Sequence, residues 1–339
     1  MAVVIDLSPL GAMTGGVWTR GQALQHAPAG VVRAAVGRTW QVVWPGVHAD
    51  AGYDLTAEQR CWAAVLASGG AGRPEAVGTR ELLPGQQRRR VRAVACGRTA
   101  ARFWGLALVD DDDPATGGQD RLVDEVAVGT HLRPLEHEGR VLHRYRLRLR
   151  PGDITRTATG VHVTSVVRTL VDLCGLLDPE AAVCALDDAL HRALVSPGQL
   201  AEALALRAGR PGADALRGAV SLADGRAESP AETLTRLVLR PVLPELEPQV
   251  ELRDDAGYVV ARFDLADRRR RLGVESDGKT AHGGPSMVAK DRARDLRAEH
   301  HGWWTERVTW YDVRRRQEVT RRRVLARVAW LEQRPLGVA

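Results

Sequence analysis

The sequence lacks the features that would place it in a membrane or secreted class. Its 339 residues contain no charge-free apolar run near the ~18 residues that a membrane-spanning helix needs. The first residues, MAVVIDLSPLGAM, show no basic segment followed by an apolar core, so no secretory leader is predicted. Hydrophobic residues make up 44% of the chain and charged residues 27%, which argues against overall disorder. We therefore expect a folded, cytoplasmic protein without a membrane partner.

Cysteine is scarce and follows no metal-binding pattern. Cys61, Cys96, Cys174 and Cys184 are widely spaced, and none belongs to a C-x-x-C pair. No histidine pattern completes a zinc site. Without a leader, we expect reduced thiols and no disulfide.

Lysine is almost absent, because Lys279 and Lys290 are the two lysines among 48 basic residues. A GC-rich genome, which encodes arginine in place of lysine, contributes to this bias, so composition alone assigns no function. The position of the charge is more informative. Residues 251–339 hold 20 basic and 14 acidic residues, whereas residues 1–250 hold 28 of each, so the net charge of +6 belongs to the last quarter. A basic terminal segment indicates a polyanionic partner, most often nucleic acid.

The chain length predicts two or three domains, and the mixture of helical and β-type patterns predicts a multidomain α+β or α/β protein. The acidic run Asp110–Asp113 before Pro114 indicates a linker. We expect a DNA-binding region with following helices over 1–109, a β-rich and then helical region over 120–225, and an α/β region over 227–335.

Residues 14–50 predict a helix over 19–27, a turn, a second helix over 31–36 and two short strands around a Pro-Gly turn. This is the element order of a winged helix-turn-helix, in which the second helix can lie in the major groove. Arg33 and Arg38 would then lie near DNA phosphates. The alternative is a small helical cap without DNA contact.

The middle region offers no catalytic constellation. Alternation over 141–149 predicts a strand with one mainly apolar and one largely basic face. Helices follow from Thr164. Asp187 and His191 are four residues apart on one of them, and we expect a surface pair.

The last region predicts the element order α-β-β-β-α-β-α. Its first helix opens at Ser229, with Glu232 as the acid of a capping box. The later elements are expected at 249–252, 258–266 and 272–277 (strands), 287–301 (helix), 303–310 (strand) and 313–331 (helix).

The last predicted helix has two faces. Its expected inner stripe is Val324, Leu325, Val328 and Leu331. The arginines at 314–316 and 321–323 are expected on the solvated face, with phosphate binding as a second use.

Three carboxylates come from two neighbouring predicted strands. Asp264 ends one strand, and Glu275 and Asp277 share a face of the next because strand side chains alternate. Paired strands lie about 4.8 Å apart, so the carboxylates can meet. Such a group predicts a site for a hard divalent cation, Mg²⁺ or Mn²⁺, which can generate hydroxide for phosphodiester hydrolysis. The alternative is that Asp264 and Asp277 only form turns at strand ends.

The motifs of this region resemble the Vsr-like branch of the PD-(D/E)XK nuclease superfamily. They are S-P-x-E at 229–232, F-D-L at 263–265, E-x-D-G at 275–278 with His282 after it, and R-x-x-x-L, G-W and R-V-T between 292 and 309. The resemblance covers about the last third of the chain. It implies a restriction-endonuclease-like α/β core with a metal-dependent nuclease site.

The resemblance also implies roles for single residues. Asp264 would be the central metal ligand, Glu275 the second ligand, and Asp277 stands where the superfamily has lysine. This branch commonly shows E-x-D, so the change does not itself mean inactivity. Glu232 matches a helix acid that assists the metal, and His282 matches a histidine that acts as base or orients a water. A surface role for His282 is the alternative.

The missing lysine leaves open which residue orients the attacking water. Lys279 lies two positions beyond Asp277 and would share its face if the strand continued. Lys290 and Arg294, on the following helix, would hold the DNA backbone. Glu232 has its own alternative, a capping role alone.

The N-terminal half resembles the winged-helix AbiEi-type antitoxins of actinobacteria. We expect a Mg²⁺-dependent DNA endonuclease guided by this winged helix, because three carboxylates near a phosphate would repel it without a cation. The alternative is an AbiEi-like DNA-binding antitoxin or regulator with a degenerate nuclease domain, and a purely structural protein is a third reading. The N-terminal resemblance and the absent lysine favour the antitoxin. DNA is the expected partner, with a cognate toxin or a repair or restriction protein as a second.

Overall fold

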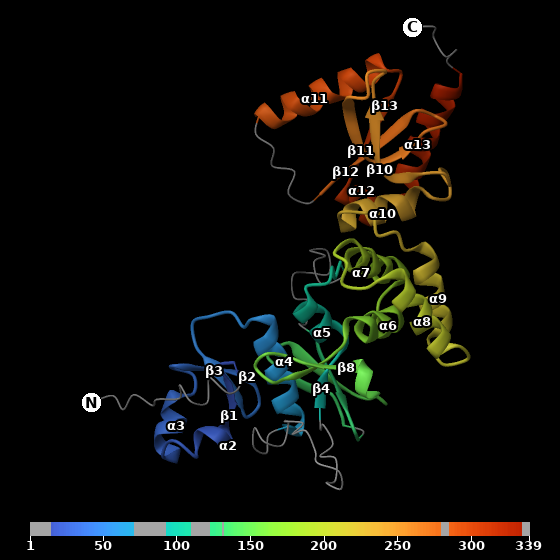
Figure 1. Cartoon of the computed structure of the whole chain (residues 1–339). Helices are drawn as coiled ribbons and strands as arrows, with labels where there is room; N and C mark the ends of the chain where they lie inside the picture. Colours follow the sequence, from blue (N-terminus) through green and yellow to red (C-terminus); the bar gives the residue numbers. More distant parts are fainter. Residues whose placement is uncertain (1–14, 71–92, 110–122, 131, 279–284, 334–339) are drawn as a thin grey trace. The chain divides into compact units, whose positions relative to one another are not determined.

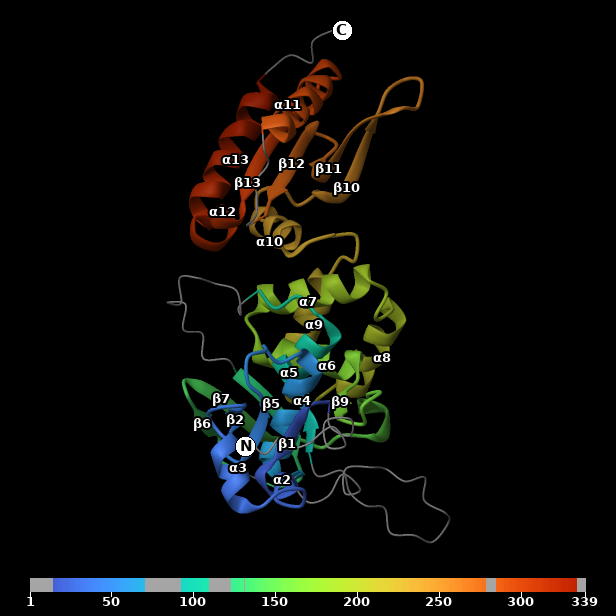
Figure 2. The same ribbon diagram turned by 90° about the vertical axis from the view of Figure 1, so that its left-hand side faces the viewer.

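The computed structural model describes residues 15–70, 93–109, 123–130, 132–278 and 285–333. The predicted linker at Asp110–Asp113 and the predicted site residues Lys279 and His282 lie outside them. The described residues form a mixed α+β structure with three sheets (Figures 1 and 2).

The chain divides into two compact units, each described by itself below. Unit 1 comprises Met1–Leu177 and Gln199–Gly212, and unit 2 comprises Asp178–Gly198 and Ala213–Ala339. Within the described ranges, no helix combines the length and apolar character that a bilayer crossing requires. All four cysteines lie in these ranges, are buried, and form no disulfide, as expected.

The first sheet of unit 1 has the antiparallel order β1-β3-β2. Thr19 and Gln22 form a reciprocal capping box that starts the first helix. The rings of Trp18 and Trp40 pack edge to face with centroids 5.2 Å apart and close a small core. The elements are β1 (Val17–Thr19), α2 (Arg20–Ala23), α3 (Ala29–Ala35), β2 (Trp40–Trp44) and β3 (Val47–Asp50).

This region follows the predicted order with two differences. Strand β1 was not predicted, and α2 ends at Ala23 instead of continuing to residue 27. Hydrogen-bonded turns replace the end of the predicted helix, because Pro28 disfavours helical backbone in the residue before it.

The second sheet of unit 1 has six strands in the order β6-β7-β5-β4-β9-β8. Apolar residues of its central strands β4 and β5 belong to two hydrophobic clusters, so both faces of the sheet are covered there. The strands are β4 (Ala93–Ala95), β5 (Val123–Val128), β6 (Leu135–His137), β7 (Arg140–Arg146), β8 (Ile154–Arg156) and β9 (His162–Thr164).

Helices α4 (Ala57–Val65), α5 (Gly97–Trp104) and α6 (Val166–Leu176) pack with this sheet or with one another. The strand predicted over 141–149 ends at Arg146, yet Leu147 and Leu149 still pack on the core. Helix α8 (Pro197–Arg207) contributes most of its residues to the same unit.

Unit 2 has a four-stranded sheet in the order β10-β11-β12-β13, antiparallel except for the parallel pair β12–β13. Helix α11 packs on the sheet, and α10, α12 and α13 pack on one another. The elements are α7 (Pro179–His191), α9 (Ala213–Leu222), α10 (Pro230–Leu239), β10 (Glu247–Arg253), β11 (Val259–Asp267), β12 (Leu272–Asp277), α11 (Pro285–His300), β13 (Trp304–Thr309), α12 (Trp310–Arg315) and α13 (Gln317–Glu332).

The core of this sheet contains the stacked rings of Phe263 and Trp303, with centroids 5.3 Å apart. Gly273 makes room for them, since a Cβ there would lie 2.2 Å from Cδ1 of Phe263. The predicted order α-β-β-β-α-β-α is present, except that the last helix breaks at Arg316.

The predicted inner stripe of that helix was wrong at Leu325. Val324 and Val328 are buried, but Leu325 is 44% exposed. Residues 324 and 325 point in directions about 100° apart on a helix with 3.6 residues per turn. One of two adjacent residues is therefore turned away from the core.

Candidate functional site

Two of the predicted carboxylates meet where β11 and β12 stop pairing. The ladder pairs Leu265 with Val274, and Asp264 and Glu275 are the next residues beyond that rung. Oδ2 of Asp264 accepts a hydrogen bond from the backbone N–H of Ser276 at 2.8 Å. This bond holds the carboxylate against β12. We call Asp264 and Glu275 the acid pair.

In the acid pair, Glu275 is buried and Asp264 is half-buried. Burial raises the pKa of Asp264, and repulsion from Glu232 adds to the shift, while the Ser276 amide opposes it. Burial, followed by repulsion from Asp264, raises the pKa of Glu275 to about 7. Oε1 of Glu275 is buried and has no hydrogen-bond partner in the described part of the chain. The negative charge of the acid pair is therefore only partly compensated by positive charges and hydrogen-bond donors.

Arg294 of α11 supplies part of the missing positive charge. Its Nη2 lies 3.1 Å from Oε2 of Glu275 and 3.7 Å from Oδ1 of Asp295. The sequence predicted that Arg294 binds DNA, and the structure shows its guanidinium directed at these carboxylates. Lys290 lies in the same helix, and its side chain is outside the description.

Asp277 forms an ion pair with a different arginine from the one that pairs with Glu275. Nη1 of Arg307, on β13, lies 3.6 Å from Oδ1 of Asp277, and its Nη2 lies 3.1 Å from Oδ2 of Asp295. Asp277 is only half-buried. Its carboxylate therefore helps to attach the end of β12 to β13 and α11.

Half of the predicted capping box is present, because Ser229 Oγ accepts from the backbone N–H of Glu232 at 3.3 Å, whereas the Glu232 carboxylate is held by other donors. Ser229 Oγ donates to its Oε1 at 2.8 Å, and the backbone N–H of Glu228 donates to its Oε2 at 2.9 Å. Gln249 Nε2 also donates to Oε2, at 2.7 Å. Both oxygens are thus occupied, and the carboxylate influences Asp264 through its charge.

The donor set fits a hard divalent cation in a limited way. Among the residues that the structure describes, no three His, Cys, Asp or Glu side chains gather as a metal site. The acid pair supplies two carboxylates, one with an unpartnered oxygen. Mg²⁺ is commonly held by one or two carboxylates, with water and substrate phosphate completing the shell. Asp264 and Glu275 are the residues that would hold it.

The raised pKa of Glu275 predicts a pH-dependent stability. The native state holds the proton more tightly than the unfolded state, whose carboxyl has the ordinary value of 4.5. The contribution of Glu275 is therefore fully present below that value and is lost as pH rises to about 7. We expect Glu275→Gln to abolish this slope and to be more stable than wild type at pH 8. Urea unfolding between pH 4.5 and pH 8 measures it, and parallel wild-type and variant profiles would contradict it.

The predicted DNA-contact residues of unit 1 are available at the surface. Arg33 lies on α3 and Arg38 in the turn that follows it, and both are exposed. Arg33 is on the second helix of the predicted helix-turn-helix. The structure thus leaves both side chains accessible to solvent.

The sequence analysis missed a buried charge cluster on β5. Asp124 and Glu125 are fully buried, although they are adjacent in the strand. Asp124 lies 3.3 Å from Arg140 and 3.7 Å from Arg102, and Glu125 lies 3.0 Å from Arg98. The sequence does contain a sign of this cluster, because two acids interrupt the otherwise apolar run VDEVAV. A charged residue flanked by core residues needs a partner of opposite charge.

The expectation for Asp187 was wrong. It does not form a surface pair with His191 but is buried, with 1% of its surface exposed. Its Oδ2 accepts from Arg236 Nη2 at 2.8 Å and from Thr233 Oγ1 at 2.8 Å, and its Oδ1 accepts from the Asp224 N–H at 2.6 Å. Sequence spacing on α7 could not show this, because the partners come from α10 and the segment before it.

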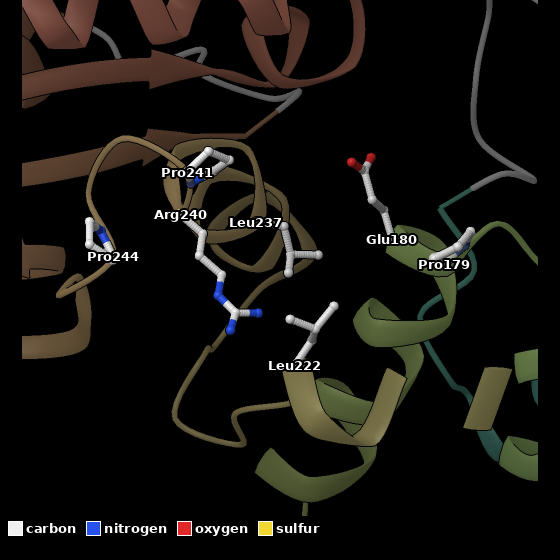
Figure 3. Close-up of a pocket in the computed structure, with 7 residues that line it drawn as sticks. All are labelled: Pro179, Glu180, Leu222, Leu237, Arg240, Pro241 and Pro244. Atoms are coloured by element: carbon white, nitrogen blue, oxygen red, sulfur yellow. The ribbon is translucent and has the colours of Figure 1, made fainter. Parts of the chain in front are cut away.

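Unit 2 also contains an apolar pocket of about 430 Å³. Figure 3 shows two leucines between an arginine on one side and a glutamate on the other. None of the predicted site residues lines it. The lining residues are Pro179, Glu180, Leu222, Leu237, Arg240, Pro241 and Pro244.

Comparison with known proteins adds a family assignment for part of the chain. Two proteins of Mycobacterium tuberculosis are 29% identical over 226 residues, which cover 66% of this chain and 76% of each relative. They are "Uncharacterized protein MT2308" of strain CDC 1551 / Oshkosh and "Uncharacterized protein Rv2248" of strain ATCC 25618 / H37Rv. Residues 93–219 match the family described as AbiEi antitoxin C-terminal domain. The match runs from β4 to α9 and does not include the acid pair. The chain thus carries an AbiEi antitoxin-type domain in residues 93–219.

Proposed function

We propose that the protein is an antitoxin-type regulator that binds DNA and pairs with a cognate toxin. The observation that carries this proposal is the AbiEi antitoxin C-terminal domain in residues 93–219. This family generally implies a toxin partner. The sequence analysis ranked the nuclease first, and the family match favours the antitoxin, so we reverse that order.

The first sheet supports a DNA-binding role. Its order of strand, two helices and a β-hairpin is that of a winged helix, with α3 as the recognition helix and β2–β3 as the wing. Arg33 and Arg38 are exposed at α3 and just beyond it. On this proposal they contact phosphate and supply the salt-dependent part of the affinity.

The test is binding to the DNA upstream of the gene, measured by fluorescence anisotropy at several salt concentrations. We expect Arg33→Ala and Arg38→Ala each to weaken binding and to lower the salt slope by about 1. Arg217→Ala, a change at an exposed arginine of α9, is the matched control. Equal binding by all four proteins would overturn the assignment of the DNA surface.

We infer a second candidate function, metal-dependent DNA cleavage by a restriction-endonuclease-like core in unit 2. The acid pair favours it, because a buried and a half-buried carboxylate that repel each other gain from a divalent cation. When bound, Mg²⁺ or Mn²⁺ would supply a hydroxide and neutralise charge on the phosphate. Asp264 and Glu275 would hold the cation, and Arg294 would hold Glu275 in place.

Cleavage of plasmid and single-stranded DNA with Mg²⁺ or Mn²⁺ tests this second candidate. We expect wild type to cut and Asp264→Ala and Glu275→Ala each to lose at least 10²-fold in rate, since a lost ligand removes the cation. Glu251→Ala, on β10 and away from the pair, is the control and should cut like wild type. If wild type and both site variants cut equally, the nuclease assignment fails and the regulator assignment is untouched.

A further inference from the structure

The last two helices carry most of the net charge of the chain. Residues 310–332 contain seven arginines and three acids, which is +4 of the total of +6. This segment forms α12 and α13 of unit 2. Neither proposed function uses it.

Ion pairs within unit 2 account for some of these arginines. Arg323 lies 2.8 Å from Glu306, and Arg327 lies 3.4 Å from the same carboxylate. Arg321 pairs with Glu318. Arg323 and Arg327 therefore attach α13 to β13, and the Arg321 pair lies within α13.

Two other arginines have no such role. Arg316, at the break between the helices, and Arg322, on α13, are exposed, and neither makes a salt bridge within the described ranges. Arg316 has Asp312 as a charged neighbour, but the segment keeps an excess of positive charge, and the self-repulsion of that charge costs stability. A polyanionic ligand would relieve it.

An exposed aromatic ring lies against one of these arginines. Tyr311 is 54% exposed, and the guanidinium carbon of Arg316 lies 4.9 Å from the centre of its ring. The other end of α13 repeats this contact, with Arg327 lying 5.3 Å from the centre of the Trp330 ring. An aromatic face beside a guanidinium group is thus present at each end of α13, and this is the combination of groups on which nucleic-acid bases stack.

We propose that Tyr311, Arg316 and Arg322, the α12–α13 surface, bind single-stranded nucleic acid independently of the winged helix and the acid pair. Arginines contact successive phosphates, and a base stacks on the tyrosine ring, which is how sequence-tolerant single-strand binding works. A duplex keeps its base faces stacked inside, so it could use only the arginines. An acidic protein could likewise use the charges but not the stacking.

The test is anisotropy of labelled oligothymidylate of about 15 nucleotides with the full-length protein. We expect Tyr311→Ala to weaken binding about 10-fold and Tyr311→Phe to bind like wild type, because stacking requires the ring and not the hydroxyl. The Arg316→Ala/Arg322→Ala variant should lower the salt slope by about 1.4, at about 0.7 per phosphate contact. The controls are Tyr258→Ala and Arg253→Ala, both exposed on the β10–β11 hairpin; both should bind the oligonucleotide unchanged.

Three results would overturn the proposal. The first is wild-type affinity in both Tyr311→Ala and the double-arginine variant. The second is a duplex of equal length that binds as tightly and is equally weakened by Tyr311→Ala. The third is polyglutamate that competes as well as oligothymidylate at equal charge, which would identify an acidic protein as the ligand class.

Discussion

Replacing Gly97 with alanine is expected to lower the free energy of unfolding of unit 1 by about 3 kcal/mol. Gly97 starts α5 with a φ of +52°, in the left-handed region that disfavours any side chain. An added Cβ would lie 2.0 Å from Oε2 of Glu125. That oxygen accepts from the backbone N–H of Arg98, and the same carboxylate pairs with the Arg98 side chain. Glu125 therefore cannot move aside without giving up the partners that make its burial tolerable.

Urea unfolding, followed by far-ultraviolet circular dichroism, measures this effect. Gly129→Ala is the matched control, because Gly129 lies just after β5 and a Cβ there would meet nothing within 4 Å. We expect the control to unfold within about 0.5 kcal/mol of wild type. If Gly97→Ala is as stable as Gly129→Ala, the close contact between the start of α5 and Glu125 is not as described.

Replacing Asp187 with alanine is expected to cost unit 2 about 3–5 kcal/mol. The change removes the acceptor for the Arg236 guanidinium, the Thr233 hydroxyl and the Asp224 N–H. The Arg236 side chain is only 11% exposed, so its charge would remain largely buried without its acidic partner. Leaving a buried charge unpaired costs more than the intact pair contributes.

The neighbouring residue supplies the control for this prediction. Asp188 pairs with Arg192 across one helical turn at the surface, and such pairs contribute about 0.3–0.5 kcal/mol. Asp188→Ala should therefore lower the unfolding midpoint only slightly, whereas Asp187→Ala should lower it strongly. Equal midpoints for the two variants would show that Asp187 does not hold α7 to α10.

Both of these sites lie inside residues 93–219, the stretch that matches the antitoxin domain. Gly97 belongs to unit 1 and Asp187 to unit 2. The matched stretch therefore contributes structural anchors to both compact units.

The order of elements was largely predictable, because it depends on local patterns. Capping residues and hydrophobic periodicity predicted the series from α10 to α13, with β12 correct at both ends. The missed elements were short. Strand β1 has three residues, too few for a period to be recognised, and its place beside β3 depends on a distant part of the chain.

The candidate site was predictable in its members but not in their pairing. Asp264 and Glu275 could be predicted on neighbouring strands, because side-chain alternation and the pairing of consecutive strands depend only on local geometry. The sequence by itself also located the net positive charge in the last quarter, because counting residues requires no fold. Which arginine neutralises which acid was decided by the tertiary structure alone. Arg294 of α11 pairs with Glu275, and Arg307 of β13 pairs with Asp277. Asp187 is buried and pairs with Arg236 of α10. These contacts join residues 19 to 49 positions apart, and burial, which sets their strength, exists only after the elements have packed.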